Sequence, residues 1–298
     1  VAGVSGYLDG LTGKQTQEHV WSELSVEIAK QNITAAQIDV TVGGLALQDG
    51  SDDWQTRFKF GSYDGIQQHS LELWDVQDQL AALRPKLPAR FRGPLPSPQA
   101  FDPPAFSFTS AQAAQTDPNQ RLLLAESLRL LQSVRGADAQ AQQIDWRLAV
   151  GVQSAEYGTL VSVNQAALVS DPTGGALSVT AGRLSYTYGL RGECLSVDTA
   201  CSSSLVALHA VCATRLDAFE CVAGGVNLLL LAAATAVTGA AGMLDAQGRC
   251  KTLDAAAGGY VRGEACGLMR LACGAGHEPP DAAQAPTLLS TTLNQDGR

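Results

Sequence analysis

The segment VDTACSSSLVALH, residues 197–209, places a cysteine between a predicted strand and a predicted helix. The apolar run CLSVDTA at 194–200 is typical of a strand, and SSSLVALHAVCATRL at 202–216 is typical of an apolar-faced helix. Cys201 is therefore expected at a strand-to-helix turn, at or just before the N-terminus of the helix.

The turn around Cys201 has the chemistry of a nucleophile site. Unpaired backbone N–H groups and the positive end of the helix dipole stabilise anions at a helix N-terminus. This environment favours the nucleophilic thiolate, and the same N–H groups can stabilise the oxyanion of an acyl transfer. The serines at 202–204 suit the first helical turn, where hydroxyls satisfy free amides. On local chemistry alone, a structural cysteine in a tight turn is the simpler interpretation.

The sequence on both sides of this segment alternates strands with helices. We expect strands at 148–153 and 220–230, and a helix with a glycine-rich entry at 173–190. Together with the strand and helix around Cys201, this β-α-β-α-β order predicts an α/β fold with a mainly parallel sheet.

The remaining elements are placed by simpler signals. Thr116-Asp117-Pro118 is typical of a helix start, and the amphipathic helix that follows covers NQRLLLAESLRLLQ. The proline-rich stretch 81–104 predicts an extended surface loop. Three further strands are expected, at 38–47, 260–271 and 285–294.

Composition and charge exclude several classes of protein. The 298 residues are 45% apolar and 16% charged, which predicts a folded chain with a sizeable core. The formal net charge of −9 gives no basic footprint for nucleic acid and argues against docking on anionic membranes. The apolar run 222–241 is broken by Gly, Asn and Thr, so we expect a strand and a helix there, not a membrane span.

Cysteine usage indicates a reduced protein. Seven cysteines are present, an odd number without a CxxC pair, and the four histidines do not cluster with them in the sequence. We therefore expect no metal site and a cytoplasmic location, although the first residue is Val1 and an organelle-targeting segment stays open.

The string around Cys201 resembles the active-site signature of β-ketoacyl synthases of the polyketide and fatty-acid synthase kind. Further segments follow in the order of that family. They are DVTVGGLALQDGSDDWQ, GSYDGIQQHSLELWDV, FDPPAFSFTSAQAAQTDPNQRLLLAESLRLL, VGVQSAEYG, TAGRLSYTYGLRG, AGGVN, GRCKTLDAAAGGYVRGEACG and NQDGR. The resemblance implies a ketosynthase domain over 37–298, preceded at 1–36 by a linker or the tail of an upstream region.

The resemblance also implies a fold and a reaction. The family has a thiolase-like, layered αβαβα fold, of which this chain would hold the N-terminal half and the first strands of the C-terminal half. Cys201 would take an acyl chain from the phosphopantetheine of an acyl carrier protein. A malonyl-type thioester would then lose carbon dioxide and attack the acyl-cysteine, in a decarboxylating Claisen condensation without a metal or redox cofactor. The complete domain would be a homodimer.

Other positions carry over as supporting residues. The resemblance places Lys251, Tyr260, Arg262, Gly263 and Glu264 near the active site, where they are expected to brace the fold. Asn294 and Asp296, in the NQDG segment, are expected to be structural. His209 lies eight residues into the helix after Cys201 and is expected to pack away from it.

Three alternatives stay open at this point. The family's two catalytic histidines lie beyond NQDGR, so the chain as given is expected to lack the groups for decarboxylation. It can be part of an active multidomain synthase, or a degenerate, non-catalytic remnant that serves for dimerisation or carrier docking. A thiolase or a chalcone-synthase-like enzyme ranks last, because the residues around its cysteine differ.

Overall fold

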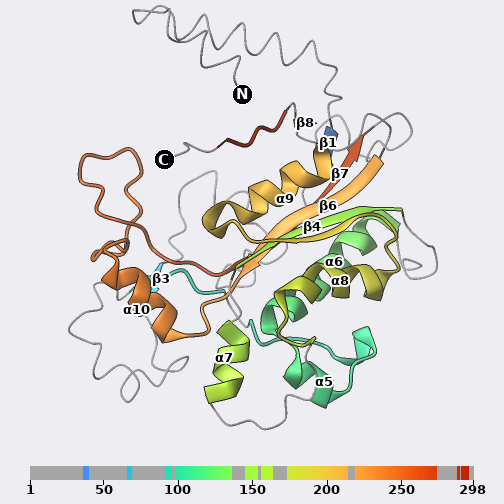
Figure 1. The fold of residues 1–298 in the computed structure, drawn as a ribbon, viewed down its shortest axis with the longest axis horizontal. Helices are drawn as coiled ribbons and strands as arrows, with labels where there is room; N and C mark the ends of the chain where they lie inside the picture. Colours follow the sequence, from blue (N-terminus) through green and yellow to red (C-terminus); the bar gives the residue numbers. More distant parts are fainter. Residues whose placement is uncertain are drawn as a thin grey trace, which may run out of the picture.

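The computed structural model describes residues 36–39, 66–68, 91–95, 98–135, 145–153, 156–163, 173–213, 219–273, 287–288 and 290–294. A six-stranded sheet in the order β5-β4-β6-β7-β1-β8 runs through its centre (Figure 1). The strands are β1 (Ala36–Asp39), β4 (Arg147–Val152), β5 (Cys194–Val197), β6 (Phe219–Asn227), β7 (Ala265–Cys273) and β8 (Thr287–Leu288). A second sheet pairs β2 (Gln67–Gln68) with β3 (Phe91–Arg92).

Helices cover both faces of the large sheet. They are α5 (Ser110–Gln115), α6 (Pro118–Arg135), α7 (Glu156–Val163), α8 (Leu177–Tyr188), α9 (Ser203–Cys212) and α10 (Ala232–Ala240), with the 3₁₀ turns η2 (Pro104–Phe106) and η4 (Ala200–Ser202). Helix α9 packs on one face against β4, β5 and β6, and α6 and α8 pack on the other (Figure 1). The described part is therefore a three-layer α/β/α arrangement.

The large sheet is mixed, so the prediction of a mainly parallel sheet is wrong. Strands β5, β4 and β6 are parallel, whereas β7 is antiparallel to β6 and to β1, and β1 is antiparallel to β8. Asn227 at the end of β6 is paired with Ala265 at the start of β7. The chain between them returns to the edge where β6 ended, so β7 must run back along it. Apolar periodicity contains no information about strand direction, and the prediction of parallel strands is correct for β4, β5 and β6 only.

Side-chain size differs between the two faces of the sheet. In β4, Leu148, Val150 and Val152 belong to the large core beneath α6 and α8, while Ala149 belongs to the smaller core beneath α9. Successive strand residues point to opposite faces, so Gly151 also faces α9. The small residues on this face let α9 approach the backbone of the sheet.

A row of three glycines crosses the sheet beneath the N-terminus of α9. Gly151 of β4 is paired with Gly225 of β6, and Gly225 is paired with Gly267 of β7. A Cβ atom at Gly151 would lie 2.5 Å from the backbone N of Ser204, and one at Gly225 would lie 3.0 Å from Ser204 Cβ. At Gly267 a Cβ atom would meet no atom within 4 Å. The helix is thus seated on two glycines, and space remains above the third.

Most predicted elements are present with shifted ends. Helix α6 begins at Pro118 as expected, and Asp117 Oδ1 accepts hydrogen bonds from the Asn119 backbone (2.8 Å) and side chain (3.0 Å). Of the strand expected at 285–294, the residues that the structure describes there, 287–288 and 290–294, include β8 and no further strand. The strand expected at 38–47 is described only as β1, and the predicted lead-in over 1–36 lies outside the described residues apart from Ala36.

The proline-rich stretch 81–104 is not entirely a surface loop, and this part of the prediction is wrong. Arg92 is 5% exposed and Leu95 is 7% exposed. The backbone N–H of Leu95 donates to the Glu264 carboxylate at 2.9 Å. Residues 91–95, the part of this stretch that carries these contacts, are held in the interior by a partner far along the chain.

Within the described residues, no helix combines the length and the apolar composition needed to cross a bilayer.

We predict that Gly151→Ala destabilises the protein by about 1–3 kcal/mol, the range for overpacking a tight core. The added methyl group would meet backbone atoms of α9, which cannot move without moving the helix. Gly182→Ala is the matched control, because a Cβ atom at this position in α8 meets nothing within 4 Å. The substitution also replaces a glycine inside a helix, which favours the folded state. We expect it to stabilise by roughly 0.5–1 kcal/mol. Urea unfolding measures both changes, and equal midpoints for Gly151→Ala and wild type would contradict the close contact.

Candidate active site around Cys201

Cys201 lies in a tight elbow between β5 and α9, as the sequence predicts. The residue before it, Ala200, has a φ of +56°, in the left-handed region that costs an L-residue roughly 1–2 kcal/mol. Three contacts hold this conformation. The Ala200 N–H donates to Asp198 Oδ1 at 3.0 Å, Ser203 Oγ donates to the Ala200 carbonyl at 2.6 Å, and the Thr199 N–H donates to Ser203 Oγ at 2.9 Å. The strained backbone turns the Cys201 side chain outward, where it is exposed.

The serines after Cys201 do not cap α9, so this part of the prediction is wrong. Ser202, at the N-cap, makes no side-chain hydrogen bond to the helix, and its Oγ donates to the Thr199 carbonyl at 2.9 Å. Ser203 also bonds to the elbow. Both hydroxyls stabilise the turn itself because the left-handed residue brings elbow carbonyls within their reach. Neither hydroxyl occupies the N-terminus of the helix beside the thiol.

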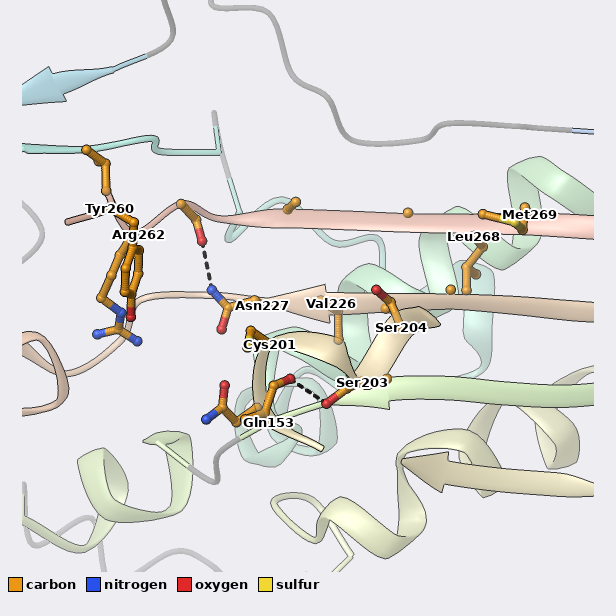
Figure 2. A pocket seen from close by; sticks show the side chains of 18 of the residues that line it. Gln153, Cys201, Ser203, Ser204, Val226, Asn227, Tyr260, Arg262, Leu268 and Met269 are labelled. Atoms are coloured by element: carbon orange, nitrogen blue, oxygen red, sulfur yellow. Dashed lines mark hydrogen bonds between the residues drawn. The ribbon is translucent and has the colours of Figure 1, made fainter. Parts of the chain in front are cut away.

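The Cys201 thiol opens into a cavity of about 800 Å³ on the α9 face of the sheet (Figure 2). The glycine row forms much of its floor, and the side chain of Met269 lines the end away from Arg262. A cavity of this size can accommodate a small organic acyl group beside the thiol.

Four polar side chains line the cavity at the edge where the parallel strands end. Gln153 follows β4, Asn227 ends β6, and Tyr260 and Arg262 precede β7. Ligand sites in α/β sheets form at the carboxyl ends of parallel strands. Neither Gln153 nor Asn227 is among the site residues predicted from the sequence, although their positions at the ends of predicted strands are a signal for them.

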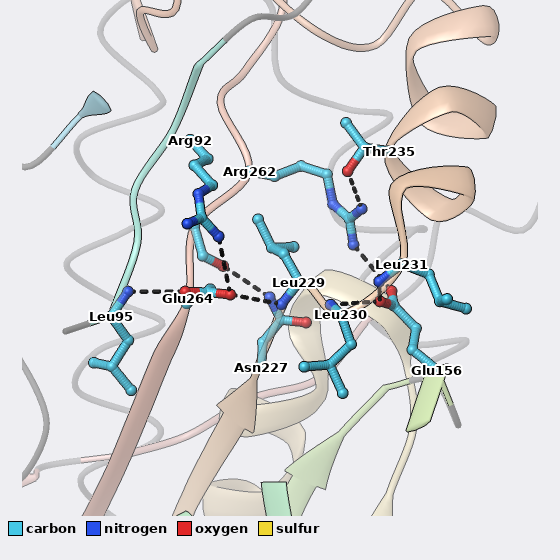
Figure 3. A network of polar contacts seen from close by, with 11 residues as sticks. Arg92, Leu95, Glu156, Asn227, Leu229, Leu230, Leu231, Thr235, Arg262 and Glu264 are labelled. Carbon is cyan, nitrogen blue, oxygen red and sulfur yellow. Dashed lines mark hydrogen bonds and ion pairs between the residues drawn. The ribbon is translucent and has the colours of Figure 1, made fainter. Parts of the chain in front are cut away.

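Glu264 stabilises the chain on both sides of this edge (Figure 3). Its carboxylate accepts hydrogen bonds from the backbone N–H groups of Leu95 (2.9 Å) and Leu229 (3.0 Å), and it forms an ion pair with Arg92 at 3.6 Å. The side chains of Glu264 and Arg92 are 1% and 6% exposed. Glu264 therefore braces the fold, which is the role that the resemblance implies.

A second carboxylate, Glu156 at the start of α7, holds the turn between β6 and α10. It accepts hydrogen bonds from the backbone N–H groups of Leu230 (2.9 Å) and Leu231 (2.8 Å). The Arg262 guanidinium lies 3.4 Å from Glu156 and donates to Thr235 Oγ1 at 2.8 Å (Figure 3). Arg262 thus links α7, α10 and the cavity wall, and it too acts as a brace.

The loop that presents Tyr260 is organised by Asp245. The Asp245 carboxylate accepts from the backbone N–H groups of Arg249 (3.2 Å) and Gln247 (2.8 Å) and pairs with Lys251 at 3.3 Å. These interactions, the Arg249 hydrogen bond first, hold the pKa of Asp245 below its ordinary value. The Asp245 N–H donates to the Tyr260 carbonyl at 3.0 Å, so the turn fixes the chain that leads into the cavity.

The other predicted residues lie away from the thiol. His209 is half-buried, and its Nδ1 lies 2.9 Å from Thr291 Oγ1; it does not line the cavity. Asn294 is exposed, while Asp296 and the other histidines, His19, His69 and His277, lie outside the described residues. In the described part of the chain, no group of three or more His, Cys, Asp or Glu side chains is placed to hold a metal ion.

We predict that Glu264→Ala destabilises the protein by about 3–5 kcal/mol, because it leaves a buried guanidinium and two backbone N–H groups without their acceptor. Asp254→Ala is the control. Asp254 also accepts a backbone hydrogen bond, from Ala256 at 2.7 Å, but in an exposed turn. Its loss should cost no more than about 1 kcal/mol. Urea unfolding compares the two variants, and similar losses would show that Glu264 is not a brace.

Comparison with known proteins agrees with this geometry. Residues 51–273 match the family model described as "Beta-ketoacyl synthase, N-terminal domain". One component of the phenolphthiocerol/phthiocerol polyketide synthase of Mycobacterium tuberculosis is 35% identical over 309 residues, covering 98% of this chain and 19% of that protein. Another component of the same synthase is 38% identical over 181 residues, covering 58% of this chain and 8% of that protein. The chain therefore spans less than a fifth of the length of these relatives.

Solved ketosynthase structures share the fold. The ketosynthase from module 6 of the bacillaene synthase of Bacillus subtilis matches with a TM-score of 0.64 at 25% identity, covering 80% of this chain and 40% of that one. An oxazolomycin ketosynthase domain of Streptomyces albus matches with a TM-score of 0.64 at 24% identity, covering 80% and 43%. These matches confirm the α/β, thiolase-like fold. With Cys201 at the elbow and the family match over 51–273, the chain belongs to the β-ketoacyl synthase family.

Proposed function

We propose that Cys201 is the acyl-accepting nucleophile of a ketosynthase that carries out a decarboxylating Claisen condensation. The observation that carries this proposal is the exposed thiol at a strained elbow, opening into a cavity of about 800 Å³. The Cys201 thiolate attacks the carbonyl carbon of an acyl thioester, and the thiol of the donor leaves. A malonyl-type thioester then loses carbon dioxide, and its enolate attacks the acyl-cysteine carbonyl. A carbon–carbon bond forms and the Cys201 thiolate is released.

The surroundings of Cys201 support the first of these steps. The N-terminus of α9 carries partial positive charge and has no side-chain cap from Ser202, so it can stabilise the thiolate and the tetrahedral oxyanion. Decarboxylation needs groups that polarise the malonyl carbonyl, which the family resemblance assigns to histidines. Among the described residues, the histidine is His209, and it lies outside the cavity. Acylation is therefore the step to test on this chain.

We predict that a short acyl thioester of N-acetylcysteamine transfers one acyl group to Cys201. Intact-protein and peptide mass spectrometry should locate the adduct, and Cys201→Ala should abolish it. Cys194 is also exposed, so Cys194→Ala is the control and should be acylated like wild type. Iodoacetamide at neutral pH should likewise react fastest with Cys201. If Cys201 reacts no faster than Cys194 or Cys250, the nucleophile is not activated, and a non-catalytic docking or dimerisation module becomes the better hypothesis.

Partners follow from the same proposal. The acyl and malonyl groups would arrive as thioesters on the phosphopantetheine of an acyl carrier protein, and no metal or redox cofactor takes part. The cytoplasm is the expected compartment. The proposals for the carrier protein and the thioesters rest on the family and on the open cavity beside the thiol.

We also propose that the complete domain is a homodimer formed at strand β5. This strand is the first in the order of the large sheet, at one edge, so one of its sides is unpaired within the described residues. Its residue Leu195 is 43% exposed, and Tyr186 on the neighbouring helix α8 is 91% exposed. An unpaired edge with exposed apolar side chains is suited to pairing with a second chain.

We predict that the protein sediments as a dimer and that Leu195→Lys shifts it toward monomer, because a charge at the edge strand opposes pairing. Leu253→Lys is the control, since Leu253 is fully exposed in a loop far from β5 in the sequence. Sedimentation velocity over a concentration series measures the change. A dimer that resists Leu195→Lys, or a wild-type monomer at all concentrations, would refute this interface.

A further inference from the structure

The cavity beside Cys201 is divided by polarity (Figure 2). Gln153, Asn227 and Arg262 lie at the same end of the cavity as Cys201 and bring amide and guanidinium groups to that end. Met269 lies at the other end of the residues drawn, beyond the glycine row, whereas the side chain of its neighbour Leu268 belongs to the core on the opposite face of the sheet. An acyl chain attached to the thiol would thus have its first atoms beside polar groups and its far atoms over the glycine row and Met269.

Two of the three polar groups are held by other residues. The Asn227 side-chain NH₂ donates to the Gly263 carbonyl at 2.7 Å, and the Arg262 guanidinium is bound to Thr235 and Glu156. The amide of Gln153 makes no hydrogen bond to any of the described residues. It therefore offers both a donor and an acceptor to a ligand.

Strand geometry places Gln153 on the same side of the sheet as the thiol. Side chains two residues apart in a strand share a face, and Gly151 contacts α9, so Gln153 continues that face one residue past the end of β4. Val152 is paired with Val226, which puts Gln153 beside Asn227. Gly151 is paired with Val197, so the chain that leads to Cys201 runs along the other side of Gln153. The Gln153 amide therefore lies between Asn227 on one side and the chain that leads to Cys201 on the other.

We propose that Gln153 is a specificity-determining residue that binds an oxygen on the acyl chain close to the thioester. The substrate class would be acyl groups with a hydroxyl or keto oxygen at the β-carbon, in preference to the saturated chain of the same length. This inference rests on the proposed acyl-accepting role of Cys201. A hydroxyl can donate to the Gln153 carbonyl or accept from its NH₂ group, and a keto oxygen can accept from the NH₂ group.

The size of the preference follows from the exposure of the amide. A site that buries an unpaired polar group rejects an apolar analogue strongly, because the group loses its water without a replacement. Gln153 is exposed at the cavity edge, so water can still reach it beside a saturated chain. We therefore expect the effect of one net hydrogen bond, about a two- to tenfold preference in the acylation rate.

The test compares matched thioesters on the full chain. The 3-hydroxybutanoyl (both enantiomers), 3-oxobutanoyl and butanoyl thioesters of N-acetylcysteamine acylate Cys201 with loss of N-acetylcysteamine, and mass spectrometry gives each second-order rate constant. In wild type, at least one oxygenated chain should react about two- to tenfold faster than butanoyl. Gln153→Met, of similar size without hydrogen-bonding groups, should bring the ratio close to one. Gln153→Asn, which keeps the amide on a shorter chain, should retain part of it.

Controls separate this inference from the proposed function. Val237→Ala, at an exposed position of α10 outside the cavity lining, should keep the wild-type ratio. A wild-type ratio near one, or a ratio unchanged in Gln153→Met, overturns the role of Gln153 while Cys201 remains an acyl acceptor. If no thioester acylates Cys201 although iodoacetamide still modifies it, the proposed function itself fails, and this inference fails with it.

Discussion

The contact between helix α9 and the glycines beneath it determines where the thiol lies. Cys201 is two residues before the helix, so any displacement of α9 moves the nucleophile. A single Cβ atom at Gly151 would overlap the backbone of the first helical turn, and interiors packed at this density transmit such a displacement. The same row of glycines continues past the helix to Gly267, where nothing covers it within 4 Å of an added Cβ. The glycine row therefore has two effects: it lets α9 pack close to the sheet, and it leaves space for the cavity beside the cysteine.

The edge of the sheet that surrounds the thiol consists of turns, and turns leave backbone groups without partners. Buried N–H groups without acceptors are costly, and here two carboxylates supply the acceptors. Glu264 satisfies Leu95 and Leu229, and Glu156 satisfies Leu230 and Leu231. Burying a carboxylate is itself unfavourable, and each is balanced by an arginine. The result is a rigid rim made from segments distant in the sequence, on which the polar side chains of the cavity are held in place.

The features that the sequence predicts correctly depend on local segments of the chain. The features that it does not predict depend on contacts between segments that are distant in the sequence. The elbow at Cys201 follows from a strand directly before an apolar-faced helix, and it was predicted correctly. The direction of β7 depends on where its connection returns, and the burial of Leu95 depends on Glu264, which is 169 residues away. For the serines after Cys201, the position in the chain predicts hydrogen bonds to the first helical turn. The positive φ of Ala200 brings the elbow carbonyls closer and redirects both hydroxyls.

Nucleophile positioning and substrate choice are separable in this architecture. Gly151 and Gln153 lie two residues apart on the same face, but they act differently. Gly151 is inside the packed sheet, where the absence of a side chain sets the height of α9. Gln153 is past the end of β4, where its side chain is exposed and is not part of the packed core. A change at the first position displaces the thiol, whereas a change at the second alters only what the thiol's neighbourhood can bind. Residues one step beyond the strand ends are therefore where relatives of the same fold can diverge in substrate without losing the geometry of acyl transfer.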